Sequence, residues 1–99
     1  MATKKDSNWL NRNTEELIAT ILRFKNRDQA ARFLRDLLTE RELIEMGNRW
    51  KAARMLSNGE SYKDIIGKTG LSSRTIARIQ RWLKSGTGGY LALISELER

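Results

Sequence analysis

Apolar residues recur at helical spacing along most of this chain, and no segment alternates apolar and polar residues as a strand would. The clearest pattern lies in residues 61–85, which predict a short helix, a turn at residues 69–71 and a longer helix. At about 100° per residue, the longer helix has an inner and an outer side. The inner side is formed by Ser72, Ile76, Ile79 and Leu83, and the outer side by Arg74, Arg78, Arg81 and Ser85. Such a helix can pack on its apolar side while it presents guanidinium groups outward.

The turn between these two helices has the residues that a helix-turn-helix requires. Gly70 stands where the chain leaves the first helix, and glycine adopts a positive φ without a steric clash. Leu71 can be buried under the turn, and Ser72 is a favourable N-cap for the second helix. We expect Ile65 and Ile66 to anchor the first helix. A plain pair of helices in a small bundle would show the same helix-glycine-helix order, so the basic outer side is what favours a DNA-binding motif.

The predicted DNA contacts follow from position on the two helices, because the start of a recognition helix reaches deepest into the major groove. The residues expected nearest the base edges are Ser73, Arg74, Ala77 and Arg78. An arginine can bridge O6 and N7 of guanine, a contact that discriminates between bases by about 1–3 kcal/mol. The residues expected to hold phosphates, which fix the register on the duplex, are Lys63, Lys68, Ser72, Thr75 and Arg81.

Two amphipathic helices are predicted in the N-terminal third of the chain. Asn13 with Glu16 three residues later resembles a capping box, so the first helix is expected to begin at Asn13 or Thr14. Asn26 is expected to end that helix and to cap the next one. Both helices have apolar stripes that are too broad for the surface of a small monomer. These stripes are therefore expected to pack on each other or against a second subunit.

The remaining segments complete an all-α chain of about six helices. Thr39 is expected to open a third helix, with Glu42 closing a capping box. A glycine-rich break at residues 85–89 separates the helix-turn-helix from a short C-terminal amphipathic helix. Residues 1–12 are expected to be a mobile basic arm, and residues 13–99 to form a single domain.

Composition excludes several classes of function. The chain has no cysteine and no histidine, which removes disulfides, the usual structural zinc sites, and Ser-His or Cys-His catalysis. We see no metal-ligand cluster, phosphate loop or activated nucleophile in the sequence, and expect neither an enzyme nor a resident metal or cofactor. No segment is apolar enough for a signal peptide or a membrane span, so we expect a cytoplasmic, nucleoid-associated protein.

The net charge of +7 is concentrated on the predicted helix-turn-helix. Residues 61–87 hold six positive groups against one negative group, whereas residues 39–60 are balanced. This concentration is the electrostatic footprint expected of a protein that attracts phosphates.

The segment LTERELIEMGNRWKAARML, residues 38–56, followed by the helix-turn-helix, resembles the Trp-repressor-like proteins. The resemblance to their YerC-type branch is closer, and it extends through the tail LKSGTGGYLALI. The residues that carry it are Tyr62, Ile65, Thr69, Gly70, Ser72, Thr75, Ile76 and Arg78. The resemblance is weakest in residues 1–25. It implies an all-α homodimer with intertwined N-terminal helices, sequence-specific binding to double-stranded DNA, and transcriptional control, with repression as the expected outcome.

The same resemblance implies a ligand site but argues against tryptophan. Polar members of the family's indole pocket align with Thr39, Arg49, Thr75 and Arg78. Ile79 stands where the repressor has glycine, and Trp82 where it has serine. These two bulky side chains would fill the space that an indole needs, so we expect no L-tryptophan co-repressor.

Two other functions compete with DNA binding. The helix-turn-helix could serve as an adaptor that docks another protein, using exposed tryptophans and the basic side. An RNA-binding regulator is the second alternative, and it would present stacking aromatic rings. The outer side of the predicted recognition helix carries arginine and serine instead, with only Tyr62 and Trp82 as aromatic candidates.

Overall fold

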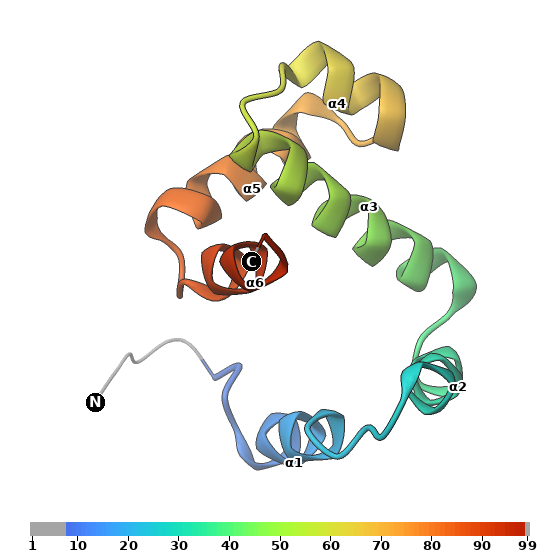
Figure 1. The fold of residues 1–99 in the computed structure, drawn as a ribbon. Coiled ribbons are helices and arrows are strands. Elements are labelled where there is room, and N and C mark those ends of the chain that lie inside the picture. Colours follow the sequence, from blue (N-terminus) through green and yellow to red (C-terminus); the bar gives the residue numbers. More distant parts are fainter. Residues whose placement is uncertain (1–7, 99) are drawn as a thin grey trace. The chain divides into compact units, whose positions relative to one another are not determined.

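The computed structural model describes residues 8–98, and these residues form helices and no strands (Figure 1). The helices are α1 (Arg12–Ile21), α2 (Arg27–Leu37), α3 (Glu40–Ser57), α4 (Tyr62–Thr69), α5 (Ser73–Ser85) and α6 (Gly89–Leu97). The predicted all-α chain of six helices is thus confirmed. The chain divides into two compact units, residues 1–39 and residues 40–99. The predicted mobile arm falls mostly on residues 1–7, which lie outside the described residues, and the single-domain assignment of residues 13–99 stays a prediction.

Helix α1 begins slightly earlier than predicted. Asn11 is its N-cap and accepts a hydrogen bond from the Thr14 backbone N–H at 3.0 Å, while the Asn11 N–H donates to the Thr14 hydroxyl at 2.8 Å. The capping box therefore pairs Asn11 with Thr14, and the predicted pairing of Asn13 with Glu16 is wrong. Glu16 instead lies 3.8 Å from the guanidinium of Arg12, one turn away on the same helix.

Helix α2 begins where the sequence predicts. The Asn26 side chain accepts from the Gln29 backbone N–H at 2.9 Å, so Asn26 is the N-cap. Just before it, Phe24 lies against Phe33 of α2, with ring centroids 5.5 Å apart. This contact packs the connection between α1 and α2 against α2.

The first unit has no interior of its own. No residue of α1 or α2 is buried. Ile18, Ile21, Leu22 and Leu37 all keep 40% or more of their surface exposed. The apolar stripes of α1 and α2 were predicted to pack on each other or against a second subunit. Packing of the two helices on each other buries little of either stripe.

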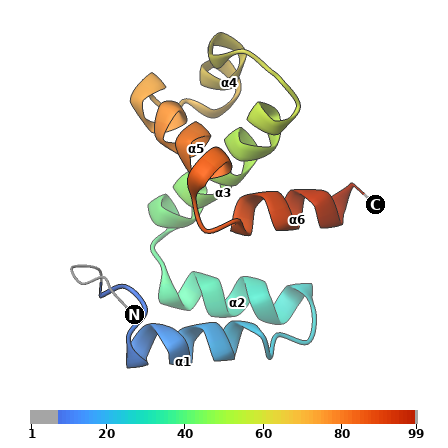
Figure 2. The same cartoon turned by 90° about the vertical axis from the view of Figure 1, so that its left-hand side faces the viewer.

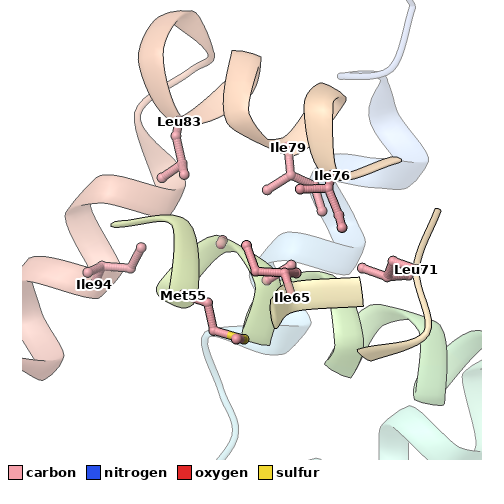
Figure 3. Close-up of a cluster of buried hydrophobic side chains, with 9 residues drawn as sticks. Met55, Ile65, Leu71, Ile76, Ile79, Leu83 and Ile94 are labelled. Atoms are coloured by element: carbon pink, nitrogen blue, oxygen red, sulfur yellow. The ribbon is translucent and has the colours of Figure 1, made fainter. Parts of the chain in front are cut away.

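The second unit is built around one apolar cluster at the C-terminal half of α3 (Figure 3). Its members come from four helices and from the α4–α5 turn. They are Ala52, Ala53, Met55, Ile65, Leu71, Ile76, Ile79, Leu83 and Ile94. Two alanines in α3 let α4 and α5 approach its backbone closely, and both views of the ribbon show these helices beside that end of α3 (Figure 2). The cluster holds the helix-turn-helix on a rigid base.

Helix α6 returns to the same unit after the glycine-rich break. Ile94 contributes to the apolar cluster and is only 5% exposed. The ring of Tyr90 stacks on Trp50 of α3, and the guanidinium of Arg54 lies 5.6 Å from the Trp50 ring centroid on that helix. Within residues 8–98, no helix combines the length and apolar character needed to cross a bilayer.

Candidate nucleic-acid interface

The turn between α4 and α5 is fixed by short hydrogen bonds. Gly70 ends α4 with φ of 75°, a left-handed conformation that favours glycine, and its N–H donates to the Ile66 carbonyl at 2.8 Å. The buried Thr69 hydroxyl donates to the Ile65 carbonyl at 2.7 Å and accepts from the Leu71 N–H at 3.2 Å. Leu71 is 7% exposed and packs into the apolar cluster, so it is buried under the turn as predicted.

Helix α5 starts at a serine cap, as the sequence predicts. The Ser72 hydroxyl accepts from the Thr75 backbone N–H at 3.1 Å, and the Ser72 and Thr75 hydroxyls lie 3.1 Å apart. These hydrogen bonds satisfy polar groups at the start of α5 and so stabilise its first turn. The side chains that follow are thereby held in a defined direction.

The two sides of α5 are chemically opposite. Ile76 and Ile79 are completely buried and Leu83 is 7% exposed, which confirms the predicted inner side. The exposed arginines of the helix are Arg74, Arg78 and Arg81. At about 100° per residue, these three fall within an arc of about 60° on the side opposite the buried residues. The apolar contacts therefore orient the arginines outward.

The other predicted contact residues lie around this arc. Ser73 and Ala77 are exposed in the first two turns of α5, and Lys63 is exposed at the start of α4. Lys68, at the end of α4, has its Nζ 3.9 Å from a carboxylate oxygen of Glu60. With the Lys68 side chain 60% exposed, water weakens this pair, which leaves the ammonium available to a phosphate. All nine predicted DNA contacts thus belong to the helix-turn-helix, and eight are exposed; Thr75 is half-buried.

The start of α5 differs in charge from the starts of the four helices before it, and α6 shares its lack of an acidic residue. Each of helices α1 to α4 has a carboxylate in its first turn, as the positive end of a helix dipole favours. The first turn of α5 has no acidic residue and carries Arg74 instead. A positive end without its own carboxylate can accept an external anion such as a phosphate.

The residues of the predicted ligand site are distributed over both units. Thr39 ends the first unit, whereas Arg49 and Arg78 lie in α3 and α5 of the second. The Nη2 of Arg49 donates to the Glu45 carboxylate at 3.0 Å, while its Nε is enclosed without an acceptor among the described residues. Trp82 stays 40% exposed beside the arginine arc. A carboxylate ligand at Arg49 would therefore compete with Glu45.

Two features of the motif were not predicted correctly. Ile66 is 40% exposed, so of the two isoleucines only Ile65 anchors α4; the two side chains point about 100° apart on the helix, and α4 turns the side of Ile65 to the core. Glu60 was not singled out at all. Its approach to Lys68 spans eight positions, from just before the N-cap of α4 to the last turn of that helix, and no local spacing rule reveals such a pair.

Comparisons with known proteins agree with this architecture. The family model described as Trp repressor protein matches residues 12–98. The uncharacterized protein YerC of Bacillus subtilis (strain 168) is 37% identical over 76 residues, which make up 77% of this chain and 73% of that protein. A TrpR-like protein from Eubacterium eligens ATCC 27750 has a solved structure with a TM-score of 0.86 and 34% identity, covering 91% of this chain and 93% of that one. The crystal structure of a putative Trp repressor from Staphylococcus aureus has a TM-score of 0.83 and 30% identity, covering 89% of this chain and 88% of that one.

Proposed function

This chain belongs to the Trp-repressor-like family, in its YerC-type branch, and from that premise we propose that it is a sequence-specific DNA-binding transcriptional repressor that acts as a homodimer. Its family is one of regulatory proteins rather than enzymes, and its fold is the family's all-α fold. The observation that carries the proposal is the outward arc of three arginines on α5, opposite two completely buried isoleucines.

Recognition would divide between bases and phosphates along the helix-turn-helix. Arg74 and Arg78 lie one turn apart near the start of α5, where a recognition helix meets base edges in the major groove. Lys63, Lys68 and Arg81 lie around them and would contact the backbone. The first turn of α5, which lacks a carboxylate, supports the same orientation toward a polyanion.

A second copy of the chain is the partner that the first unit needs. Helices α1 and α2 bury none of their own residues, and apolar side chains on both are exposed. Exposed apolar stripes of this breadth require a covering surface. An intertwined dimer would cover the stripes of each copy with those of the other. Two α5 helices related by a dyad would then read half-sites about 34 Å apart.

We further propose that L-tryptophan is not a co-repressor of this protein. Ile79 is completely buried within the core of the second unit, and Trp82 adds a second bulky side chain on α5. The guanidinium of Arg49, a predicted ligand residue, already contacts Glu45 at 3.0 Å. These features support a helix-turn-helix that acts without a bound L-tryptophan.

Selection of bound sites from a random DNA pool tests the proposed function most directly. We expect a palindromic sequence, because two identical heads related by a dyad read the same half-site twice. Affinity for that duplex should fall with salt at a slope of about −0.9 for each neutralised phosphate on logarithmic axes. Failure to enrich any sequence, together with affinity that is insensitive to salt, would contradict the proposal and favour an adaptor role. Preferential capture of single-stranded RNA would favour the RNA-binding alternative.

A further inference from the structure

The connection between α1 and α2 and the first residue of α2 carry a second cluster of positive charge, formed by Arg23, Lys25 and Arg27. All three side chains are exposed. Among residues 8–98, none of the three has an ion pair or a side-chain hydrogen bond. We propose that this basic loop is a second surface for the phosphate backbone of duplex DNA, separate from the helix-turn-helix. The inference rests on the proposed function and extends it to the first unit.

Within residues 8–39, the excess positive charge lies in this loop alone. The rest of that range carries more negative than positive groups. The positive groups are Arg12, Arg32 and Arg35, and the negative groups are Glu15, Glu16, Asp28 and Asp36. Arg12 and Arg32 lie 3.8 and 3.3 Å from carboxylates one turn away. In this part of the chain, the basic loop is therefore where a polyanion meets a net positive charge.

The capping residues around the loop keep that charge intact. Asn26 caps α2, and the Gln29 side chain reaches back to accept from the Lys25 backbone N–H at 2.8 Å. Aspartate and glutamate serve these two positions about as well in general, but each would place a negative charge inside the cluster. Asp28 directly follows Arg27 and is the nearest acidic residue, and its carboxylate lies 3.3 Å from Arg32 on the next turn of α2. The local structure is thus satisfied by neutral groups.

Hydrogen bonds hold the backbone of the loop in one conformation. The N–H of Arg23 donates to the Thr20 carbonyl at 3.0 Å, and that of Phe24 to the Ile21 carbonyl at 3.2 Å. Together with the Asn26 cap, these bonds hold the three cations within one short arc. A loop that is already held in this way loses less conformational freedom when it binds the phosphate backbone of DNA.

The single aromatic ring of the loop argues for duplex DNA over single strands. Proteins that bind single strands place exposed aromatic rings where bases can stack. Phe24 is half-buried against Phe33 and is not presented in this way. Three cations without a stacking ring suit a regular phosphate backbone, which is recognised by charge.

A matched pair of double variants tests this inference in the full-length protein. Arg23→Gln/Arg27→Gln removes two charges from the basic loop, and Arg12→Gln/Arg32→Gln removes the same number of charges at two positions outside it, where carboxylates one turn away balance them. Affinity is measured against salt on the selected operator and on a mixed-sequence duplex. For the loop variant we expect the salt slope to become shallower by about 0.9 for each phosphate that the protein no longer neutralises, equally on both duplexes. The control should keep the wild-type slope, and circular dichroism should show unchanged helix content for both variants.

Each alternative outcome contradicts the inference in a distinct way. Equal slopes for wild type and the loop variant overturn the basic loop as a DNA-binding surface while leaving the proposed function intact. Equal changes in both double variants mean that net charge alone matters, which also overturns it. Weaker binding to anionic lipid vesicles with an unchanged DNA slope assigns the loop to a membrane surface instead. A wild-type protein without affinity for any duplex overturns the proposed function and this inference together.

Discussion

The ring of Tyr90 stacks on the ring of Trp50, with centroids 6.1 Å apart and planes 25° from parallel. The stack joins the first turn of α6 to the middle of α3, although a glycine-rich break precedes α6. Together with Ile94, it attaches the C-terminal helix to the unit that carries the helix-turn-helix.

Removal of this stack should destabilise the second unit. Tyr90→Ala removes the aromatic pair, worth about 0.5–1.5 kcal/mol, and the burial of a half-buried ring. We expect the free energy of unfolding to fall by about 1–3 kcal/mol, measured by urea denaturation with Trp fluorescence. Tyr90→Phe keeps the ring and should behave like the wild type. A similar destabilisation in Tyr90→Phe would mean that the hydroxyl, not the stack, matters.

The buried isoleucines of α5 should dominate the stability of the motif. Ile76→Ala removes a completely buried side chain at a cost of about 2–5 kcal/mol, because a cavity adds to the transfer free energy of the missing atoms. Ile44→Ala makes the same change at a position that is 65% exposed, and should alter the stability of a monomeric form by no more than about 0.5 kcal/mol. Thermal unfolding of both variants at low protein concentration provides the comparison. Equal destabilisation would contradict the assignment of the core.

Two glycines of the motif should respond in opposite directions to alanine. A Cβ would meet nothing within 4 Å at either Gly70 or Gly67, so sterics with neighbours do not decide the result. Gly70 has φ of 75°, where alanine costs about 1–2 kcal/mol, whereas Gly67 lies inside α4, where alanine should stabilise by up to about 1 kcal/mol. Chemical denaturation of the two variants measures the signs. A stabilising Gly70→Ala would show that the turn is not held in the left-handed conformation.

Arg74 and Lys63 should differ in what they contribute to DNA binding. Arg74→Ala should weaken binding to the selected operator and relax the preference at one base position, by about 1–3 kcal/mol of discrimination. Lys63→Ala should lower the affinity for duplexes of all sequences alike and reduce the salt slope of binding by about 1. Titration of operator and single-base variants by fluorescence anisotropy separates the two patterns. The role given to Arg74 fails if its removal weakens binding to operator and random DNA equally.

L-Tryptophan should leave the protein unchanged. Titration of the amino acid in a calorimeter should give no heat of binding, and operator affinity should be the same with and without it. The physical reason is the bulk of Ile79 and Trp82 on α5. A micromolar binding signal would refute this. If the wild-type protein gives no heat of binding, the variant Trp82→Ser provides a check. Binding of L-tryptophan to the variant alone would identify the Trp82 side chain as the obstruction.

Local rules predict most of the motif from sequence, because the signals there do not compete. Gly70, Leu71 and Ser72 each have one favourable role, and each adopts it. At the start of α1 two rules apply at once. Asn11 with Thr14 and Asn13 with Glu16 both satisfy a capping pattern, and the first pair forms in the structure. Local sequence could not choose between them.

Packing between helices was harder to predict than their existence. Ala52 is completely buried, although a small side chain gives a weak apolar signal. Met46 lies at helical spacing from Leu43 and Trp50, a pattern that predicts burial, yet it is 53% exposed, because α4 and α5 cover only the C-terminal half of α3. The predicted DNA-binding residues are all brought into one motif by the fold. The basic loop between α1 and α2 was missed, although three cations within five residues is a readable signal.

The hydrogen bonds that hold the α4–α5 turn use backbone groups and the short hydroxyls of Thr69, Ser72 and Thr75, and none uses the side chain of Arg74 or Arg78. The two arginines proposed to read bases are therefore separate from the side chains that hold the turn, although Ser72 and Thr75 are also predicted phosphate contacts. On the proposed function, substitutions at the two arginines should therefore alter the preferred operator while the turn and both of its helices stay intact.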